Sequence, residues 1–206
     1  MLSEKTKIAV LVSGGGTNLQ ALIDAEKSGV IKSGEIVLVV SSRADAYALE
    51  RARRANVPTA VAEKKAYPDK ESFERALEDA IDGAGAELIV LAGFMCILSE
   101  RFTKKYENRI INVHPSLIPS FCGEGFYGLR VHEAALSYGV KVTGATTHFV
   151  NEVPDGGRII MQKAVEIKDG DTPETLQRRV MEEAEWIILP RSVELVSAKI
   201  REEKTK

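Results

Sequence analysis

Residues 7–29, KIAVLVSGGGTNLQALIDAEKSG, decide the fold of this chain. The apolar run Lys7–Val12 indicates a buried strand, and the three glycines Gly14–Gly16 follow it almost directly. Apolar residues then recur at helical spacing from Leu19, until Gly29 marks a typical helix end. A strand joined by a glycine turn to an amphipathic helix is the opening unit of an α/β sheet.

The same alternation of strand and helix continues through the first half of the chain. We predict further strands at Glu35–Val40, Pro58–Ala62, Glu87–Ala92 and Arg109–Val113. Helical spacing with a charged opposite face lies between them, in the stretches 45–56 and 70–85. Short strands that are almost wholly apolar indicate a parallel sheet covered by helices on both faces.

The pattern changes after Gly139, where strands and helices no longer alternate. The stretches 141–150 and 158–167 indicate two strands, and the turn between them contains a proline and a pair of glycines. We predict that these strands form an antiparallel pair added to the parallel sheet. A long helix follows, because Thr172 can cap it and Pro173 occupies the favoured first position.

The predicted fold class is α/β: a Rossmann-like, mostly parallel sheet flanked by helices, with a C-terminal antiparallel strand pair and a long C-terminal helix. That helix is expected to run toward Leu195, and the charged end 201–206 is expected to fray. With 206 residues, 44% of them hydrophobic, the chain can bury a substantial core, so we expect a single domain over 1–206.

The composition argues against several classes of protein. The formal net charge of -2 disfavours a nucleic-acid binder with a basic surface. No apolar run reaches the roughly 18 residues of a membrane span, and the N-terminal stretch lacks the pattern of a signal peptide. Cys96 and Cys122 lie far apart without metal-ligand spacing, which suits a reducing cytosol. We therefore expect a cytoplasmic protein.

The glycine loop after the first strand is a candidate phosphate site. Exposed amides at a helix N-terminus attract anions, and Thr17 and Asn18 would add side-chain donors. The loop does not match the dinucleotide fingerprint, because Leu19 holds the place of the third glycine. A tight turn that binds nothing is the alternative. Arg43, after the second strand, would suit the 2′-phosphate of NADP, although a solvated charge is the simpler interpretation.

Two polar side chains interrupt the apolar run Ile110–Pro119, IINVHPSLIP. Asn112 and His114 are two residues apart, so both side chains point to the same side of an extended strand. Pro115 biases His114 toward extended geometry, at the carboxyl end of the strand, where parallel sheets bind ligands. We therefore predict that Asn112 and His114 belong to a functional site.

Three other polar residues are weaker candidates. His148 lies within a predicted strand and is expected to be a hydrogen-bonded structural residue. His132, His148 and His114 could together bind zinc, but no local pair has ligand spacing, so no metal site is predicted. Asp155 lies in a turn that glycines make deformable, and because turn aspartates are common, the pattern alone leaves its role open.

The chain resembles the phosphoribosylglycinamide formyltransferase family, folate-dependent enzymes of purine biosynthesis. Nearly the whole chain takes part, through the segments IAVLVSGGGTNLQALIDA, VLAGFMCILS, INVHPSLIPSF, THFVNEVPDGG and GDTPETLQRRV. The NVHPS segment followed by an Asp-Gly-Gly turn is specific to enzymes that use formyl-tetrahydrofolate. The SGGGTNL loop indicates the glycinamide ribonucleotide branch. Relatives that formylate initiator tRNA or hydrolyse the folate carry a further domain, for which we expect no room here.

The resemblance implies a role for each matching position. The catalytic residues would be Asn112, His114 and Asp155. The phosphate and ribose of the ribonucleotide would be bound by Gly15, Gly16, Thr17, Asn18, Lys70 and Glu185. The folate would be bound by Met95, Cys96, Ile97, Leu98 and Val153. The domain would thus have a phosphate-binding half, 1–105, and a catalytic and folate-binding half, 106–206.

The chain departs from the family pattern in three places. Cys96 stands where an arginine is frequent beside the folate. The segment between Pro119 and His132 is longer than usual, which indicates a rebuilt lip at the substrate entrance. One additional residue precedes Pro190, so Glu185 is aligned by counting back from that proline, with Glu182 and Glu183 as alternatives.

The reaction implied by the resemblance is transfer of the formyl group of 10-formyltetrahydrofolate to the amine of glycinamide ribonucleotide. Asn112 and a protonated His114 would stabilise the oxyanion, and Asp155 would favour the imidazolium and relay the proton. The partners would be small molecules, without nucleic acid, membrane or metal, and the protein would be a monomer or a homodimer. Another formyl-tetrahydrofolate transferase or hydrolase, or an NADP-binding oxidoreductase, is the alternative.

Overall fold

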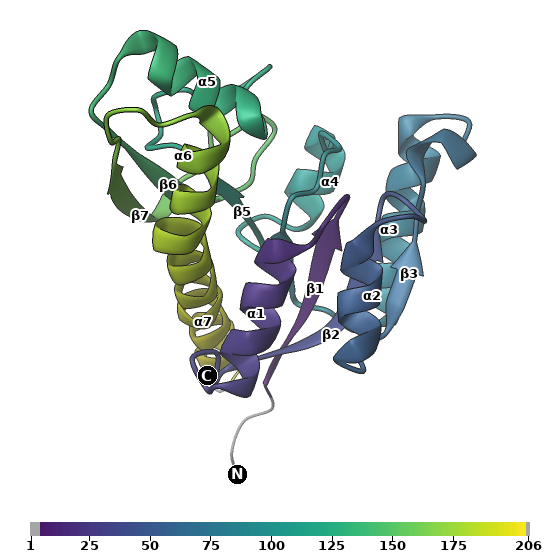
Figure 1. Ribbon diagram of the computed structural model, residues 1–206. Coiled ribbons are helices and arrows are strands. Elements are labelled where there is room, and N and C mark those ends of the chain that lie inside the picture. Colours follow the sequence, from purple (N-terminus) through teal and green to yellow (C-terminus); the bar gives the residue numbers. More distant parts are fainter. Residues whose placement is uncertain (1–4, 205–206) are drawn as a thin grey trace.

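The structure is a computed structural model that describes residues 5–204 (Figure 1). Its strands are β1 (Thr6–Val12), β2 (Gly34–Ser41), β3 (Thr59–Val61), β4 (Leu88–Leu91), β5 (Ile110–His114), β6 (Val142–Phe149) and β7 (Ile159–Glu166). They form one sheet in the order β3-β2-β1-β4-β5-β6-β7. The first five strands are parallel, whereas β6 and β7 are antiparallel to their neighbours. The predicted fold class is confirmed.

The α-helices are α1 (Thr17–Lys27), α2 (Tyr47–Arg54), α3 (Lys70–Gly83), α4 (Glu100–Lys105), α5 (Leu129–Tyr138), α6 (Pro173–Val180) and α7 (Trp186–Glu203). A short 3₁₀ turn, Lys64–Ala66, precedes α3. Helices α4 and α5 were not predicted, because α4 is short and α5 buries only three of its residues, fewer than a regular apolar stripe. None of the described helices is long and apolar enough to cross a membrane.

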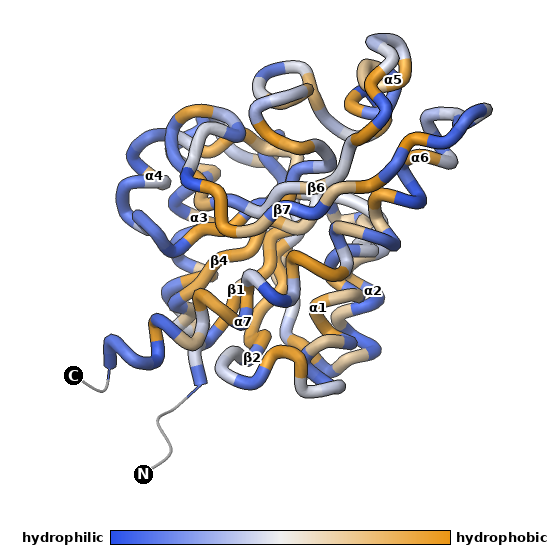
Figure 2. Tube along the Cα trace, turned by 90° about the vertical axis from the view of Figure 1, so that its left-hand side faces the viewer, coloured by the Kyte–Doolittle hydropathy of each residue, from blue (hydrophilic) through white to orange (hydrophobic). Residues whose placement is uncertain are grey.

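The two faces of the sheet pack against different helices. Residues Ile8, Val10 and Val12 of β1 join one apolar cluster with α1, α2 and α7. Their neighbours Ala9 and Leu11 point the other way and join a second cluster with α3 and α4. Figure 2 shows these apolar segments as orange tubes along β1 and β4 inside the molecule, with the polar α4 outside.

The predicted long C-terminal helix consists of two helices with a π-helical turn between them. Thr172 caps α6 through its side chain, as predicted, and Pro173 opens the helix. The hydrogen bonds of the π turn, Met181–Glu185, span five residues instead of four, so this turn would accommodate the additional residue that the resemblance implies. Helix α7 continues to Glu203, so residues 201–203 are helical where the sequence predicted a frayed end. Residues 205–206 lie outside the described residues.

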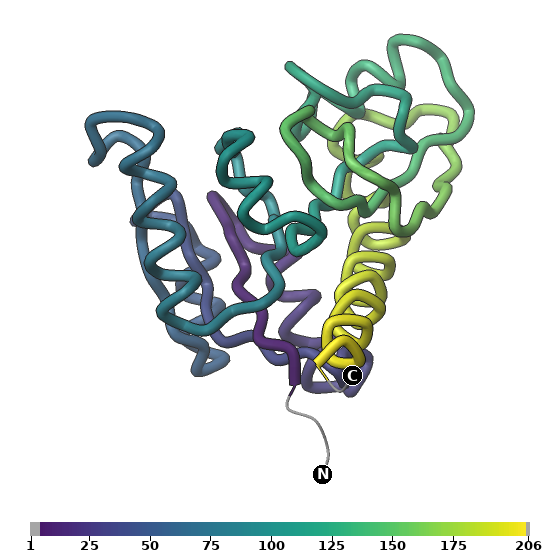
Figure 3. The backbone as a smooth tube through the Cα atoms, turned by 180° about the vertical axis from the view of Figure 1, so that it is seen from behind, coloured from purple at the N-terminus to yellow at the C-terminus, as the bar shows by residue number. Residues whose placement is uncertain are grey.

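The segments that carry the candidate site gather at one end of the molecule. Figures 1 and 3 show α5 and α6 at the end opposite the two chain termini. The glycine loop after β1 and the loops after β4 and β5 all leave the sheet at the carboxyl ends of neighbouring parallel strands. Ligands of open α/β sheets bind at such an edge.

We predict that Gly144→Ala destabilises the protein by about 2–3 kcal/mol, as overpacked core positions do. A Cβ atom at Gly144 in β6 would lie 2.0 Å from the carbonyl oxygen of Lys163 in β7, too close for the strands to stay paired. Gly83→Ala is the matched control, because its Cβ at the end of α3 would meet nothing within 4 Å. Urea denaturation measures both, and equal stabilities of the two variants would contradict the close approach of the strands.

Candidate active site

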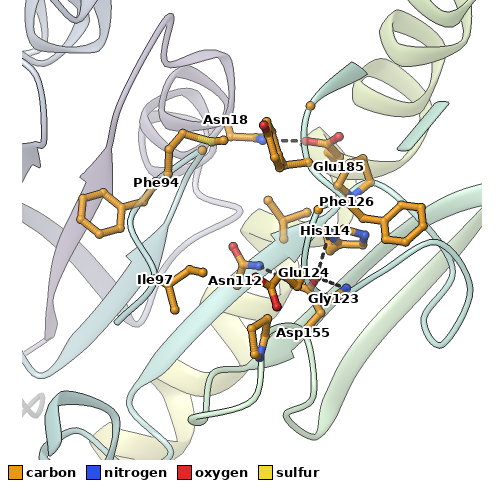
Figure 4. Close-up of a pocket in the computed structure, with 18 of the residues that line it drawn as sticks. Asn18, Phe94, Ile97, Asn112, His114, Gly123, Glu124, Phe126, Asp155 and Glu185 are labelled. Carbon is orange, nitrogen blue, oxygen red and sulfur yellow. Dashed lines mark hydrogen bonds and ion pairs between the residues drawn. The ribbon is translucent and has the colours of Figure 1, made fainter. Parts of the chain in front are cut away.

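A cavity of about 810 Å³ opens beyond the carboxyl ends of β4 and β5 (Figure 4). Its walls come from the start of α1, the loop after β4, the end of β5, the turn after β6 and the α6–π turn segment. The lip segment, which we define as 121–128, contributes Gly123–Gly128. The cavity has the size of a small-molecule site, and both apolar and polar side chains line it.

Asp155 lies at the centre of a polar cluster in this cavity. Its Oδ2 accepts a hydrogen bond from the Gly123 amide at 2.9 Å and lies 3.4 Å from Nδ1 of His114. Its Oδ1 lies 3.5 Å from the Asn112 amide nitrogen and 3.5 Å from Nε2 of His148. The predicted residues Asn112, His114 and Asp155 are therefore brought together, although Asp155 is some forty residues away in sequence (Figure 4).

The pairing of β5 with β6 explains the cluster. Asn112 and His114 share one side of β5, and the antiparallel register places His148 of β6 directly opposite Asn112. The two side chains are 3.2 Å apart. His148 is buried and hydrogen-bonded within the strand, as expected, and it does not line the cavity. Its contact with Asn112 could have been anticipated by aligning the strand 141–150 antiparallel to Arg109–Val113.

Burial and charge act in opposite directions on the acid and the base of the cluster. Burial opposes ionisation of Asp155, but the hydrogen bond from His148 and the nearby His114 outweigh it and lower the pKa of the carboxyl. Burial also disfavours the imidazolium form of His114 and outweighs Asp155, so the pKa of His114 is lowered. Desolvation thus exceeds the attraction of the carboxylate for the imidazolium in the structure without substrates.

The lip segment takes part in the same cluster. The carbonyl oxygen of Phe121 lies 2.8 Å from Nε2 of His114, opposite the nitrogen that faces Asp155. The ring of Phe121 packs edge-on against Phe126 and Tyr138, with centroids 6.4 and 6.0 Å away. The lip segment thus contacts both His114 and, through Gly123, Asp155.

A second polar pair lies across the cavity, beside the glycine loop. Asn18 of α1 donates a hydrogen bond of 2.6 Å to Glu185, which is 6% exposed (Figure 4). Burial raises the pKa of Glu185, and the hydrogen bond from Asn18 offsets this only in part. Glu182 and Glu183 are exposed, so among the three alternatives only Glu185 faces the cavity.

The remaining predicted residues are placed unevenly. Asn18 lines the cavity, whereas Gly15, Gly16 and Thr17 lie next to it at the start of α1 and are not among the lining residues. Lys70 is not among the residues that line the cavity; its amine lies 3.9 Å from the buried Glu74 at the start of α3.

Three of the five predicted folate residues line the cavity, namely Met95, Cys96 and Ile97. Met95 and Ile97 are strongly exposed there. Leu98 is instead buried in the apolar cluster under α3 and α4. Val153 is exposed and lies just outside the lining, beside Pro154.

Arg43 does not reach the cavity. It forms a two-point ion pair with Asp45, at 2.9 and 2.7 Å, and both side chains are exposed. This is the solvated charge that the simpler interpretation expected. Among the described residues, no three histidine, cysteine or acidic side chains are arranged to hold a metal ion.

Several comparisons with known proteins agree with this geometry. A family model for formyl transferases matches residues 6–193. The trifunctional purine biosynthetic protein adenosine-3 of Gallus gallus is 47% identical over 95% of this chain, which is 19% of that protein. The chain spans 14% to 19% of the length of the trifunctional relatives.

Single-function relatives match over most of their own length. The phosphoribosylglycinamide formyltransferase of Haemophilus influenzae is 42% identical over 89% of this chain and 84% of that protein. The crystal structure of glycinamide ribonucleotide transformylase 1 from Symbiobacterium toebii is 43% identical. Its TM-score is 0.88, and the match covers 95% of this chain and 89% of that one.

His132 of α5 is fully buried at the cavity wall, and neither ring nitrogen has a hydrogen-bond partner among the described residues. Burial, helped by the nearby His114, lowers the pKa of His132 to about 4. In the unfolded chain His132 binds a proton near its usual pKa of 6.5, whereas in the folded chain it stays neutral down to about pH 4. The contribution of the neutral His132 to the free energy of unfolding is therefore fully present above pH 6.5 and is lost as the pH falls toward 4.

We predict that the wild type loses about 2 kcal/mol more unfolding free energy between pH 7 and pH 5 than His132→Leu does. The leucine variant should be at least as stable as the wild type at pH 7, because it removes two unpaired polar atoms. Denaturant titrations at both pH values measure the difference. Parallel pH dependence of the two proteins would contradict a buried, neutral His132.

Proposed function

The chain belongs to the formyl transferase family, and from this we propose that it transfers the formyl group of 10-formyltetrahydrofolate to the amine of glycinamide ribonucleotide, in de novo purine biosynthesis. The observation that carries the proposal is the gathering of Asn112, His114 and Asp155 around one point of the cavity. A phosphate-binding module would have no use for such a cluster.

The two substrates have separate walls of the cavity available. The phosphate of the ribonucleotide suits the amides of the glycine loop, and its ribose hydroxyls suit the Asn18–Glu185 pair. The folate suits the apolar wall formed by Met95, Cys96 and Ile97. In this arrangement the amine and the formyl carbon meet beside Asp155, between the two walls.

Attack of the amine on the formyl carbon creates a tetrahedral intermediate with a negative oxygen. Asn112 donates its amide hydrogen to that oxygen, and a preorganised donor of this kind contributes on the order of 3 kcal/mol. His114 is neutral before the reaction, because burial lowers its pKa, and it takes up a proton from water while the negative charge is present. Its two N–H groups then face Phe121 and Asp155, so its positive charge, and not a direct hydrogen bond, stabilises the oxygen. His114 returns the proton to water when the intermediate collapses.

Asp155 provides the path for the proton. Its lowered pKa keeps it a carboxylate at neutral pH, so it can accept the proton that the attacking amine loses. The proton then passes, through water, to N10 of the folate as that nitrogen departs. No covalent bond between protein and formyl group is required in this sequence.

The decisive experiment mixes the protein with 10-formyltetrahydrofolate and glycinamide ribonucleotide and follows the folate absorbance. A change that needs both substrates supports the proposal. A change in absorbance when only the folate is present would indicate a hydrolase. An unchanged absorbance when both substrates are present would overturn the assignment of glycinamide ribonucleotide as the formyl acceptor.

Asp155→Asn and His114→Ala should each reduce kcat by a factor on the order of 100 to 1000. The first variant removes the proton acceptor, and the second removes the imidazolium charge beside the oxyanion. Thermal unfolding and circular dichroism establish that the variants are folded. A folded variant with a kcat within a few-fold of the wild type would refute the role of that residue.

Lys70→Ala should raise the KM for the ribonucleotide and leave kcat unchanged, if Lys70 assists the phosphate as the family resemblance implies. The lysine would have to leave Glu74 and reach across to the glycine loop. Lys65→Ala is the control, since Lys65 is a nearby, strongly exposed lysine. Equal KM values in the two variants would remove Lys70 from the site.

A further inference from the structure

Helix α2 holds the glycine loop from behind. The amide of Ala48 donates a hydrogen bond to the carbonyl oxygen of Gly14 at 3.0 Å. Nε of Arg51, one turn further along α2, donates to the carbonyl oxygen of Gly15 at 2.8 Å. Two successive carbonyl groups of the loop are therefore turned toward the same helix.

This arrangement decides where the loop amides point. In a trans peptide the carbonyl oxygen and the following N–H point in opposite directions. Since the carbonyls of Gly14 and Gly15 face α2, the amides of Gly15 and Gly16 face away from it. Neither amide has an acceptor in the described part of the chain. Together with the free amides at the start of α1, they form a concave group of donors for an anion.

The loop has little freedom to adopt another conformation against α2. Gly16 has a φ of +73°, and a Cβ atom there would lie 2.7 Å from Cβ of Ala48 and 3.3 Å from Cδ of Arg51. Only glycine permits this close approach. The side chain of Arg51 therefore packs directly on the loop as well as binding its carbonyl.

Arg51 is itself fixed by two further contacts. Its Nη1 donates to the side-chain oxygen of Gln20 in α1 at 3.1 Å. Its guanidinium lies over the ring of Tyr47, 5.1 Å from the centroid, on the same helix. One side chain thus joins the glycine loop, α1 and α2, and brings a permanent positive charge to the back of the loop.

We propose that Arg51 is the positioning residue of the phosphate site: it orients the amides of Gly15 and Gly16 toward the phosphate of the ribonucleotide without touching the phosphate. This inference rests on the proposed function, because it takes the phosphorylated substrate from it. It assigns to Arg51 a task distinct from that of the cluster around Asp155, and it predicts an effect on one substrate only.

The test compares Arg51→Ala with Arg53→Ala, a matched control on the exposed side of the same helix. We expect Arg51→Ala to raise the KM for the ribonucleotide about tenfold or more, as loss of a hydrogen bond from a charged group does. The inhibition constant of ribose 5-phosphate should rise by the same factor. The kcat and the KM for the formyl donor should stay within about twofold, because the reacting groups are untouched.

Arg51→Lys serves as the conservative variant. Lysine keeps the charge but cannot bind Gly15 and Gln20 at once, so its KM should lie between those of the wild type and the alanine variant. An unchanged ribonucleotide KM in Arg51→Ala, or an equal loss for both substrates, would overturn the proposal, as would a lysine variant no better than alanine. A wild type without formyl transfer would instead refute the proposed function, and calorimetric binding of ribose 5-phosphate would then still test Arg51.

Discussion

The antiparallel pairing of β5 with β6 is the constraint on which the site depends. The parallel part of the sheet ends at β5, and β6 returns beside it in the opposite direction. This return places His148 opposite Asn112. The turn that follows β6 then folds back along the strands, so that the carboxylate of Asp155 lies 3.4 Å from His114 and 3.5 Å from His148.

The strand pattern and the pair Asn112 and His114 could be predicted because both follow from spacing along the chain. Apolar runs marked the strands, and a two-residue interval defined a shared side chain direction. The contact between His148 and Asn112 could not be predicted in this way, because it joins residues of two different strands. The lowered pKa of His114 was also out of reach, since it depends on the depth of burial. Helix α5 was not predicted because it buries only three residues, one of them the polar His132, which is too few for a regular apolar stripe.

The residues around the cavity come partly from regular strands and helices and partly from the irregular lip segment. Asn112, His114 and His148 lie on paired strands, and the glycine loop is held by α2, so the groups that would orient the substrates are anchored to regular structure. The lip segment instead has no helix or strand, and Gly123, Gly125 and Gly128 in it have positive φ angles. Its contacts with His114 and Asp155 are made through the backbone, by the Phe121 carbonyl and the Gly123 amide. Side chains in this segment can therefore vary without loss of those contacts.

The π turn at Met181–Glu185 has a consequence for the history of the family. A residue gained in the middle of an α-helix would rotate everything beyond it by about 100°, since the helix has 3.6 residues per turn. The local widening of the π turn would absorb one extra residue, with the capped start of α6 on one side and the Asn18–Glu185 hydrogen bond on the other left in place. Homologous chains of different length should accordingly be aligned with their gap inside this turn, and with Glu185 counted from the C-terminal side.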